Sequence, residues 1–180
     1  MSFRQYAKHL FALSKILIQV TIMENKLPSR KQIRLKNYDY TQCGSYYITI
    51  CVNNKMKLFE LGNNATAPQN LLLKKRIREL CNKFQIEIDI YAIMPNHIHM
   101  LITFLKQKSG CDIQRVVQWF KTMTTNDYIS LVKQSVLPPF EKHLWQKSYY
   151  EHVVRNDEDY ANIYEYIKNN PLEWKLDNYY

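Results

Sequence analysis

The chain has 180 residues, a formal net charge of +9 and a sequence pI of about 9.3, a length that suits one ordinary domain. Hydrophobic residues make up 46% of it, and only 3 Gly and 6 Pro occur, which excludes a disordered chain and a flexible interdomain linker. It contains no apolar run long enough to cross a membrane and no CxxC motif, so we expect no membrane span, no zinc ribbon and reduced cysteines in a cytoplasmic protein.

The first segment differs from the rest of the chain. Residues 1–22 combine basic side chains with an apolar stretch that Lys15 interrupts, but they lack the small-residue cleavage site of a secretory signal. Met23 then begins a polar segment that resembles the start of a separate coding sequence. We therefore expect that translation begins at Met23, or that residues 1–22 form a dispensable extension, and that residues 23–180 form a single domain.

Hydrophobic periodicity predicts a chain that mixes strands and helices. In chain order, the expected elements are strands at 45–52 and 56–61, a helix at 67–84, strands at 86–94 and 97–104, a helix at 112–132, a short strand at 152–154, and a last helix that starts at Asn156 and is stopped by Pro171. This order suggests an α+β fold, with a ferredoxin-like antiparallel sheet and helices packed on one face.

Two histidines interrupt an apolar strand. Alternation in residues 86–91 assigns Ile86, Ile88 and Ile90 to the inner face. In residues 97–104 it assigns Ile98, Met100, Ile102 and Phe104 to one face and His97, His99, Leu101 and Thr103 to the other. The two imidazoles therefore point the same way, about 7 Å apart along the strand at about 3.3 Å per residue. They can converge on one ion if another ligand joins them, but two hydrogen-bonded histidines on a half-exposed face explain the pattern as well.

The last helix offers a candidate partner for the histidines. Its core stripe at helical spacing consists of Tyr160, Ile163, Tyr164 and Ile167. Tyr166 falls off this stripe and Asn170 follows it by one turn on the same side, so a phenol and an amide oxygen could face one site together. By helical geometry alone, an ordinary surface tyrosine is the simpler interpretation of Tyr166.

Three segments together resemble a known family: MPNHIHML at 94–101, LWQKSYYEHVVRN at 144–156 and YIKNNP at 166–171. From about Tyr38 to Trp174 the sequence resembles the REP-associated tyrosine transposases, relatives of the small insertion-sequence transposases of the HUH single-tyrosine type. The resemblance implies an HUH-endonuclease type of fold. It also implies that His97, His99 and Asn170 bind a divalent metal, Mg²⁺ or Mn²⁺, and that Tyr166 is the nucleophile.

The resemblance further implies a function. We expect a sequence- and structure-specific single-stranded DNA endonuclease and strand transferase, a transposase that cuts near REP-like palindromic hairpins through a covalent 5′-phosphotyrosine. Such a protein would be a monomer or homodimer in the cytoplasm, associated with the bacterial nucleoid. Two alternatives stay open: a regulator that binds DNA or RNA hairpins without cutting, and a metal phosphodiesterase that uses activated water and does not need Tyr166.

A basic, aromatic arm precedes the first predicted strand. Cations that meet the backbone and aromatic rings that stack on bases suit single-stranded nucleic acid. The candidate DNA-binding residues are Arg30, Lys31, Arg34, Lys36, Tyr38 and Tyr40. Without the resemblance, a solvated arm is an equally good interpretation. Glu151 and His152 could support the site or contact DNA, but a structural role is the expected one.

Overall fold

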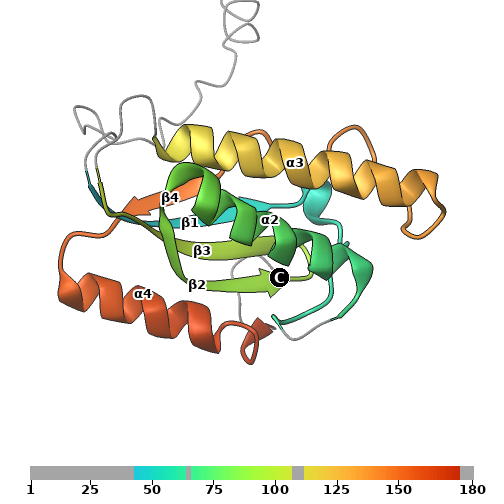
Figure 1. The fold of residues 1–180 in the computed structure, drawn as a ribbon. Helices are drawn as coiled ribbons and strands as arrows, with labels where there is room; N and C mark the ends of the chain where they lie inside the picture. Colours follow the sequence, from blue (N-terminus) through green and yellow to red (C-terminus); the bar gives the residue numbers. More distant parts are fainter. Residues whose placement is uncertain (1–42, 64–65, 107–111, 175–180) are drawn as a thin grey trace, which may run out of the picture. The chain divides into compact units, whose positions relative to one another are not determined.

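The computed structural model describes residues 43–63, 66–106 and 112–174. Its elements are β1 (Gly44–Cys51), the 3₁₀ turn η1 (Asn53–Lys55), α2 (Pro68–Phe84), β2 (Glu87–Met94), β3 (His97–Phe104), α3 (Ile113–Lys133), β4 (Tyr150–Val153) and α4 (Asp157–Asn169) (Figure 1). The predicted elements are confirmed to within two residues at each end, with one exception: residues 56–61 form no strand.

The strands form one antiparallel sheet in the order β2-β3-β1-β4. With α2 and α3 as the crossovers, the chain order βαββαβ and this strand order are those of a ferredoxin-like fold, which confirms the predicted class. β3 lies between β1 and β2, so both of its edges are hydrogen-bonded, while β4 is an edge strand. The two histidines of β3 are therefore fixed to the interior of the sheet.

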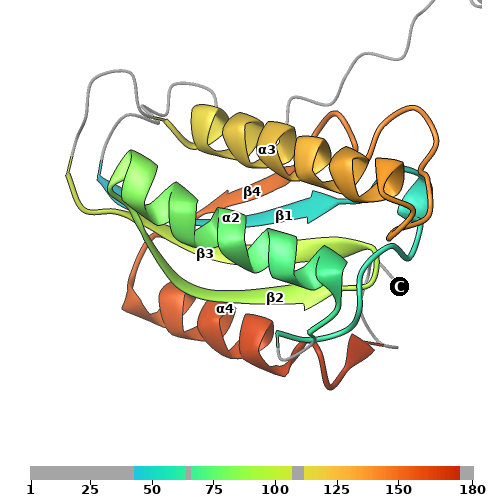
Figure 2. The ribbon, with the colours of Figure 1, turned by 45° about the vertical axis from the view of Figure 1, so that its right-hand side comes forward.

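Helices cover both faces of the sheet. α2 and α3 lie side by side on one face, as predicted, and α4 lies against the opposite face beside β2 and β3 (Figures 1 and 2). α4 takes this position because its apolar stripe has a second cluster to cover. Its buried Ile167, with the half-buried Tyr160, Ile163 and Tyr164, packs against that cluster, which comprises Tyr47, Ala92, Met94 and Leu101.

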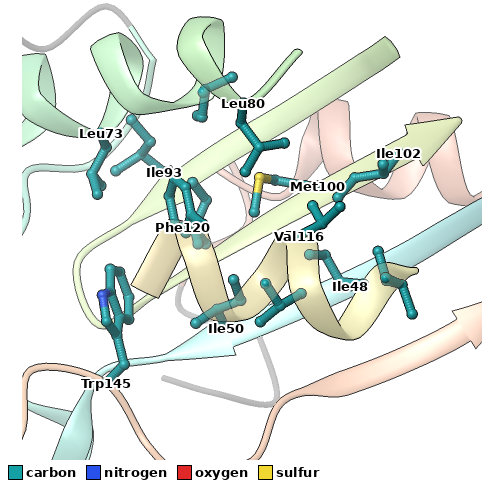
Figure 3. Close-up of a cluster of buried hydrophobic side chains, with 14 of the residues drawn as sticks. Ile48, Ile50, Leu73, Leu80, Ile93, Met100, Ile102, Val116, Phe120 and Trp145 are labelled. Carbon is teal, nitrogen blue, oxygen red and sulfur yellow. The ribbon is translucent and has the colours of Figure 1, made fainter. Parts of the chain in front are cut away.

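The larger core lies between the sheet and the helices α2 and α3 (Figure 3). The apolar face predicted for β3 is confirmed, since all of its members are buried in this cluster: Ile98, Met100, Ile102 and Phe104. From β1 and the residue after it, the cluster also contains Tyr46, Ile48, Ile50 and Val52. Phe120 of α3 is fully buried in the same cluster. Its replacement by Ala would lower the free energy of unfolding by about 3–5 kcal/mol. This core packs against one face of the sheet and so supports the other face, which α4 covers.

The predicted strand at residues 56–61 is wrong. After η1 the chain crosses the end of the sheet, and the amides of Leu58 and Phe59 both donate to the carbonyl of Pro95, at 2.9 and 3.1 Å. Phe59 is buried and stacks on Trp145. The alternating apolar residues of this segment therefore anchor a loop to the β2–β3 turn.

The predicted inner face of β2 is wrong at Ile90. A register shift between Ile88 and Ile90 lets Ile88 pair with Ile102 and Ile90 with Leu101. Asp89 is the extra residue of this bulge, and a bulge reverses the alternation of the residues beyond it. Ile90 consequently packs under α4, whereas Tyr91 packs with the larger core.

Candidate active site

The candidate site lies on the sheet face that α4 covers, at the start of β3. His97 and His99 are both fully buried there, in contrast to the half-exposed face considered from sequence. In the antiparallel pairing of β3 with β1, His97 lies opposite Cys51 and His99 lies opposite Thr49. Because residues two apart on a strand share a face, the pleat directs both imidazoles toward the same space.

The two imidazoles converge. His97 Nε2 and His99 Nε2 lie 2.9 Å apart, and the ring centroids are separated by 4.5 Å. The prediction that both side chains point the same way is therefore confirmed.

Neighbouring side chains select the tautomer of each ring. His97 Nδ1 lies 2.7 Å from Asn96 Oδ1, which can only accept, so Nδ1 carries the proton. His99 Nδ1 lies 2.8 Å from Thr49 Oγ1 and 2.9 Å from the Tyr47 hydroxyl. Thr49 donates its own proton to the Tyr47 oxygen at 3.1 Å, so Thr49 accepts from His99 and His99 Nδ1 also carries the proton.

These tautomers make both Nε2 atoms acceptors that face each other. Two acceptors at this separation attract only through a shared cation, either a proton or a metal ion. Two ligands about 2.1 Å from one ion and about 90° apart would be about 3.0 Å from each other, close to the Nε2 separation of 2.9 Å. The histidine pair therefore fits a divalent metal.

Asn170 supplies a candidate oxygen ligand. It is only 4% exposed, and its Oδ1 accepts no hydrogen bond within the described residues. Its backbone amide donates to the carbonyl of Tyr166 at 3.0 Å, which places it one helical turn after that tyrosine on the same side of the chain. The described residues hold no cluster of three His, Cys, Asp or Glu side chains suited to a metal, so amide, water or substrate oxygens would complete such a site.

Tyr166 lies beside the histidines and is open to solvent. Its ring centroid is 5.5 Å from that of His99, with the ring planes at 67°, and 40% of the residue is exposed. The neighbouring Ile167 is fully buried, as the predicted stripe requires. The structure thus brings Tyr166 next to the imidazole pair while leaving it accessible to a large substrate.

The start of α4 is tied to the edge strand. Asn156 caps the helix by accepting from the Asp159 amide at 2.8 Å, as predicted. Asp159 also accepts from His152 of β4 at 2.8 Å and from the Arg155 amide at 3.1 Å. The hydrogen bond from His152 is the main reason that the pKa of Asp159 lies below its ordinary value. His152 thus contacts the helix start, and Glu151 is buried in β4.

Several residues around the site were not identified from sequence. Tyr47 contacts both Tyr166 and Tyr150 edge-on, with centroid distances of 6.1 and 5.9 Å. The ring centroids of Trp174 and His97 are 5.7 Å apart, and the Lys57 ammonium lies 5.8 Å from the centroid of the Trp174 ring. Period-two parity could have placed Tyr47 and Thr49 on one face, but their pairing with β3 is a long-range contact that no local pattern reports.

The candidate DNA-binding residues from Arg30 to Tyr40 lie outside the described residues. Within the described part of the chain, no helix has the length and apolar character needed to span a bilayer.

The site sits on a ferredoxin-like scaffold, and comparison with known proteins identifies the family. The chain belongs to the family of IS200-like transposases, whose model matches residues 40–170. Relatives named as REP-associated tyrosine transposases also match, so the predicted resemblance is confirmed. Membership of this family makes the chain an enzyme of the transposase class that processes nucleic acid.

The chain is similar to individual proteins as well as to the family model. The chain is 36% identical over 167 residues to an uncharacterised protein of Haemophilus influenzae, covering 84% of this chain and 93% of that one. It is 22% identical over 138 residues to the REP-associated tyrosine transposase of Escherichia coli, covering 74% and 70%. A solved structure of a REP-associated tyrosine transposase bound to a REP hairpin matches with a TM-score of 0.58 and 20% identity, over 78% of this chain and 74% of that one. This last match supports the fold.

Proposed function

We propose that the protein is a metal-dependent single-stranded DNA endonuclease and strand transferase that acts near hairpins through a covalent 5′-phosphotyrosine. The observation that carries the proposal is an exposed phenol, Tyr166, placed against two buried imidazoles whose Nε2 atoms converge. A module that only binds hairpins has no need of this combination.

In this proposal His97, His99 and Asn170 hold a divalent ion, Mg²⁺ or Mn²⁺. A mixed set of imidazole nitrogens and an amide oxygen suits Mn²⁺ well and Mg²⁺ acceptably. When bound, such an ion supplies Lewis-acid stabilisation to a nonbridging oxygen of the scissile phosphate.

Tyr166 performs the covalent step. The Tyr166 hydroxyl loses a proton to solvent as its oxygen attacks phosphorus. The new bond joins the tyrosine oxygen to phosphorus, the bond from phosphorus to the 3′ oxygen breaks, and that oxygen takes up a proton. The products are a 5′-phosphotyrosine and a free 3′-hydroxyl. Because the link retains the energy of a phosphodiester, attack by a 3′-hydroxyl rejoins the strand without ATP.

We propose DNA hairpins formed by REP-like palindromes as the substrate. Support comes from the family, from the related structure that holds a REP hairpin, and from the basic charge of the chain. Arg30, Lys31, Arg34 and Lys36 would neutralise backbone phosphates, and Tyr38 and Tyr40 would stack on bases.

A labelled-hairpin assay tests the proposal. Wild type, Tyr166→Phe and Tyr164→Phe are incubated with 5′- and 3′-labelled single-stranded hairpin DNA and Mn²⁺, then resolved on a denaturing gel. Tyr164 is the matched control, because it lies two residues away on the same helix and packs against the smaller core cluster. We expect a metal-dependent protein–DNA adduct in wild type and Tyr164→Phe but not in Tyr166→Phe. Cleavage without adduct in all three proteins would instead indicate activated water, and hairpin binding without cleavage would indicate a regulator.

A further inference from the structure

We propose that Tyr47 is a positioning residue that couples the two halves of the candidate site. It sets the tautomer of His99 through its hydroxyl and the orientation of Tyr166 through its ring. The inference rests on the proposed function for its effect on cleavage, but its effect on His99 can be measured in the metal-free protein.

The hydroxyl acts through a closed triangle of contacts. Tyr47, Thr49 and His99 Nδ1 are mutually within hydrogen-bond distance, at 2.9, 2.8 and 3.1 Å, and Thr49 donates to the Tyr47 oxygen. With Nδ1 protonated, all three contacts are favourable, because His99 donates to both oxygens. With Nδ1 unprotonated, the contact between Thr49 Oγ1 and Nδ1 would join two acceptors. The triangle therefore selects the Nδ1–H tautomer.

Within this triangle, Tyr47 determines which group donates and which accepts each hydrogen bond. A threonine hydroxyl can rotate to donate or to accept. While its proton is held by the Tyr47 oxygen, Thr49 must accept from His99. Without that oxygen, Thr49 can turn its proton toward Nδ1, and the imidazole proton then moves to Nε2, where it faces His97. An Nε2–H group cannot bind a metal, so the site would lose a ligand.

The ring of Tyr47 acts on the nucleophile. It is only 8% exposed and stands edge-on to Tyr166 at 85°, with 6.1 Å between centroids. It also lies 5.6 Å from the ring of His99, so one side chain contacts both the candidate ligand and the candidate nucleophile. Edge-to-face aromatic pairs are directional, so this contact restricts the orientation of the otherwise half-exposed Tyr166.

Conservative and truncating variants separate the two roles. Tyr47→Phe removes the hydroxyl and keeps the ring, whereas Tyr47→Leu removes both. Tyr46→Phe is the matched control, because Tyr46 is fully buried on the opposite face of the same strand. Thermal melts and circular dichroism establish that each variant is folded. Long-range ¹H–¹⁵N NMR then reports the His99 tautomer without metal, and calorimetric titration with Mn²⁺ reports the dissociation constant.

We expect Tyr47→Phe to shift His99 toward the Nε2–H tautomer and to weaken Mn²⁺ binding by 10- to 100-fold, roughly the range for lost partners of metal-binding histidines. Saturating Mn²⁺ should restore its rate of adduct formation to within about twofold of wild type, whereas Tyr47→Leu should stay at least about tenfold slower. Tyr46→Phe should change none of these.

The inference is overturned if Tyr47→Phe keeps the Nδ1–H tautomer and binds Mn²⁺ as wild type does, or if Tyr47→Leu matches Tyr47→Phe in rate at saturating metal. Failure of the proposed function has a different signature: wild type itself then forms no adduct, while NMR of the metal-free protein still reports the action of Tyr47 on His99.

Discussion

Tyr166 of α4 stands edge-on to His99 of β3, with 5.5 Å between ring centroids and 67° between ring planes. The two residues are far apart in sequence and belong to elements of different kinds. Their contact exists only when α4 is seated on the sheet, so the chemistry proposed for Tyr166 depends on the attachment of this helix as well as on the histidines.

Metal binding should raise the melting temperature of wild type. A ligand that binds only the folded state stabilises it by about 2.7 kcal/mol at 100 times its dissociation constant. We expect Mn²⁺ to raise the melting temperature of wild type but not of His99→Gln, in scans with and without EDTA. His143→Gln, which alters an exposed histidine, is the control and should respond like wild type. An equal response of all three proteins would rule out the histidine pair as the metal site.

Asn170→Ala should weaken Mn²⁺ binding by at least about tenfold, since loss of a ligand is expected to cost no less than loss of a supporting contact. Its effect on the stability of the metal-free protein should be small, about 1 kcal/mol or less, because Oδ1 accepts no hydrogen bond within the described residues. Titration calorimetry and urea unfolding measure the two quantities. Asn169→Ala, at the exposed neighbouring position, should leave the affinity unchanged.

The contact between His152 and Asp159 should make stability depend on acidity. Because the pKa of Asp159 is lowered in the folded state, its contribution is complete above the unfolded pKa of about 4 and is lost as pH falls through the lower folded value. The difference in melting temperature between wild type and Asp159→Asn should thus shrink as pH falls below about 4, where the folded Asp159 carboxylate becomes protonated. Glu165→Gln, in an exposed pair with Lys168, should show little difference at any pH.

Arg76 should stabilise the packing of α2 against α3. Its guanidinium contacts both carboxylate oxygens of Asp127 at 2.6 Å, and only 13% of the Arg76 side chain is exposed. Arg76→Met should lower the free energy of unfolding by about 1–3 kcal/mol, because it leaves a partly buried carboxylate without its donor. Urea unfolding measures the change. Lys168→Met removes an exposed pair and should cost about 0.5 kcal/mol or less.

Hairpin binding should weaken steeply with salt. Each phosphate neutralised on a single strand contributes about −0.7 to the slope of log K against log salt concentration. Substituting Arg30, Lys31, Arg34 and Lys36 together by Gln should make the slope shallower by up to about 3 if all four contact phosphates. Fluorescence anisotropy over a salt series measures the slope. An unchanged slope would show that this arm does not contact the backbone.

The sequence predicted most of the fold because its signals are local. The alternation in β1 and β3, the helix starts near residues 112 and 156, and the stripe that ends at Ile167 each follow from residues near one another in the chain. The prediction of a strand at residues 56–61 was wrong because alternating apolar residues also occur in a loop whose side chains anchor it to the core. The bulge at Asp89 was missed because it is defined by pairing with another strand.

The sequence predicted the candidate ligands and the candidate nucleophile, but it did not predict the residues that contact them. The HxH spacing placed both imidazoles on one face, and helical periodicity separated Tyr166 from the buried stripe. The roles assigned to His97, His99, Asn170 and Tyr166 came from the family resemblance, and they stay predictions. The triangle around His99 depends on the register of β1 against β3, which a single sequence does not report.

The difference between the two core clusters has a consequence for hydrogen exchange. The histidines belong to a strand bonded on both edges and backed by the larger core, whereas α4 is held by the smaller cluster around Ile167. Segments with fewer buried contacts open at a lower free-energy cost than the whole domain. The amides of α4 should therefore exchange with solvent deuterium well before those of β3, so that the phenol can leave the imidazoles and return while the sheet stays folded.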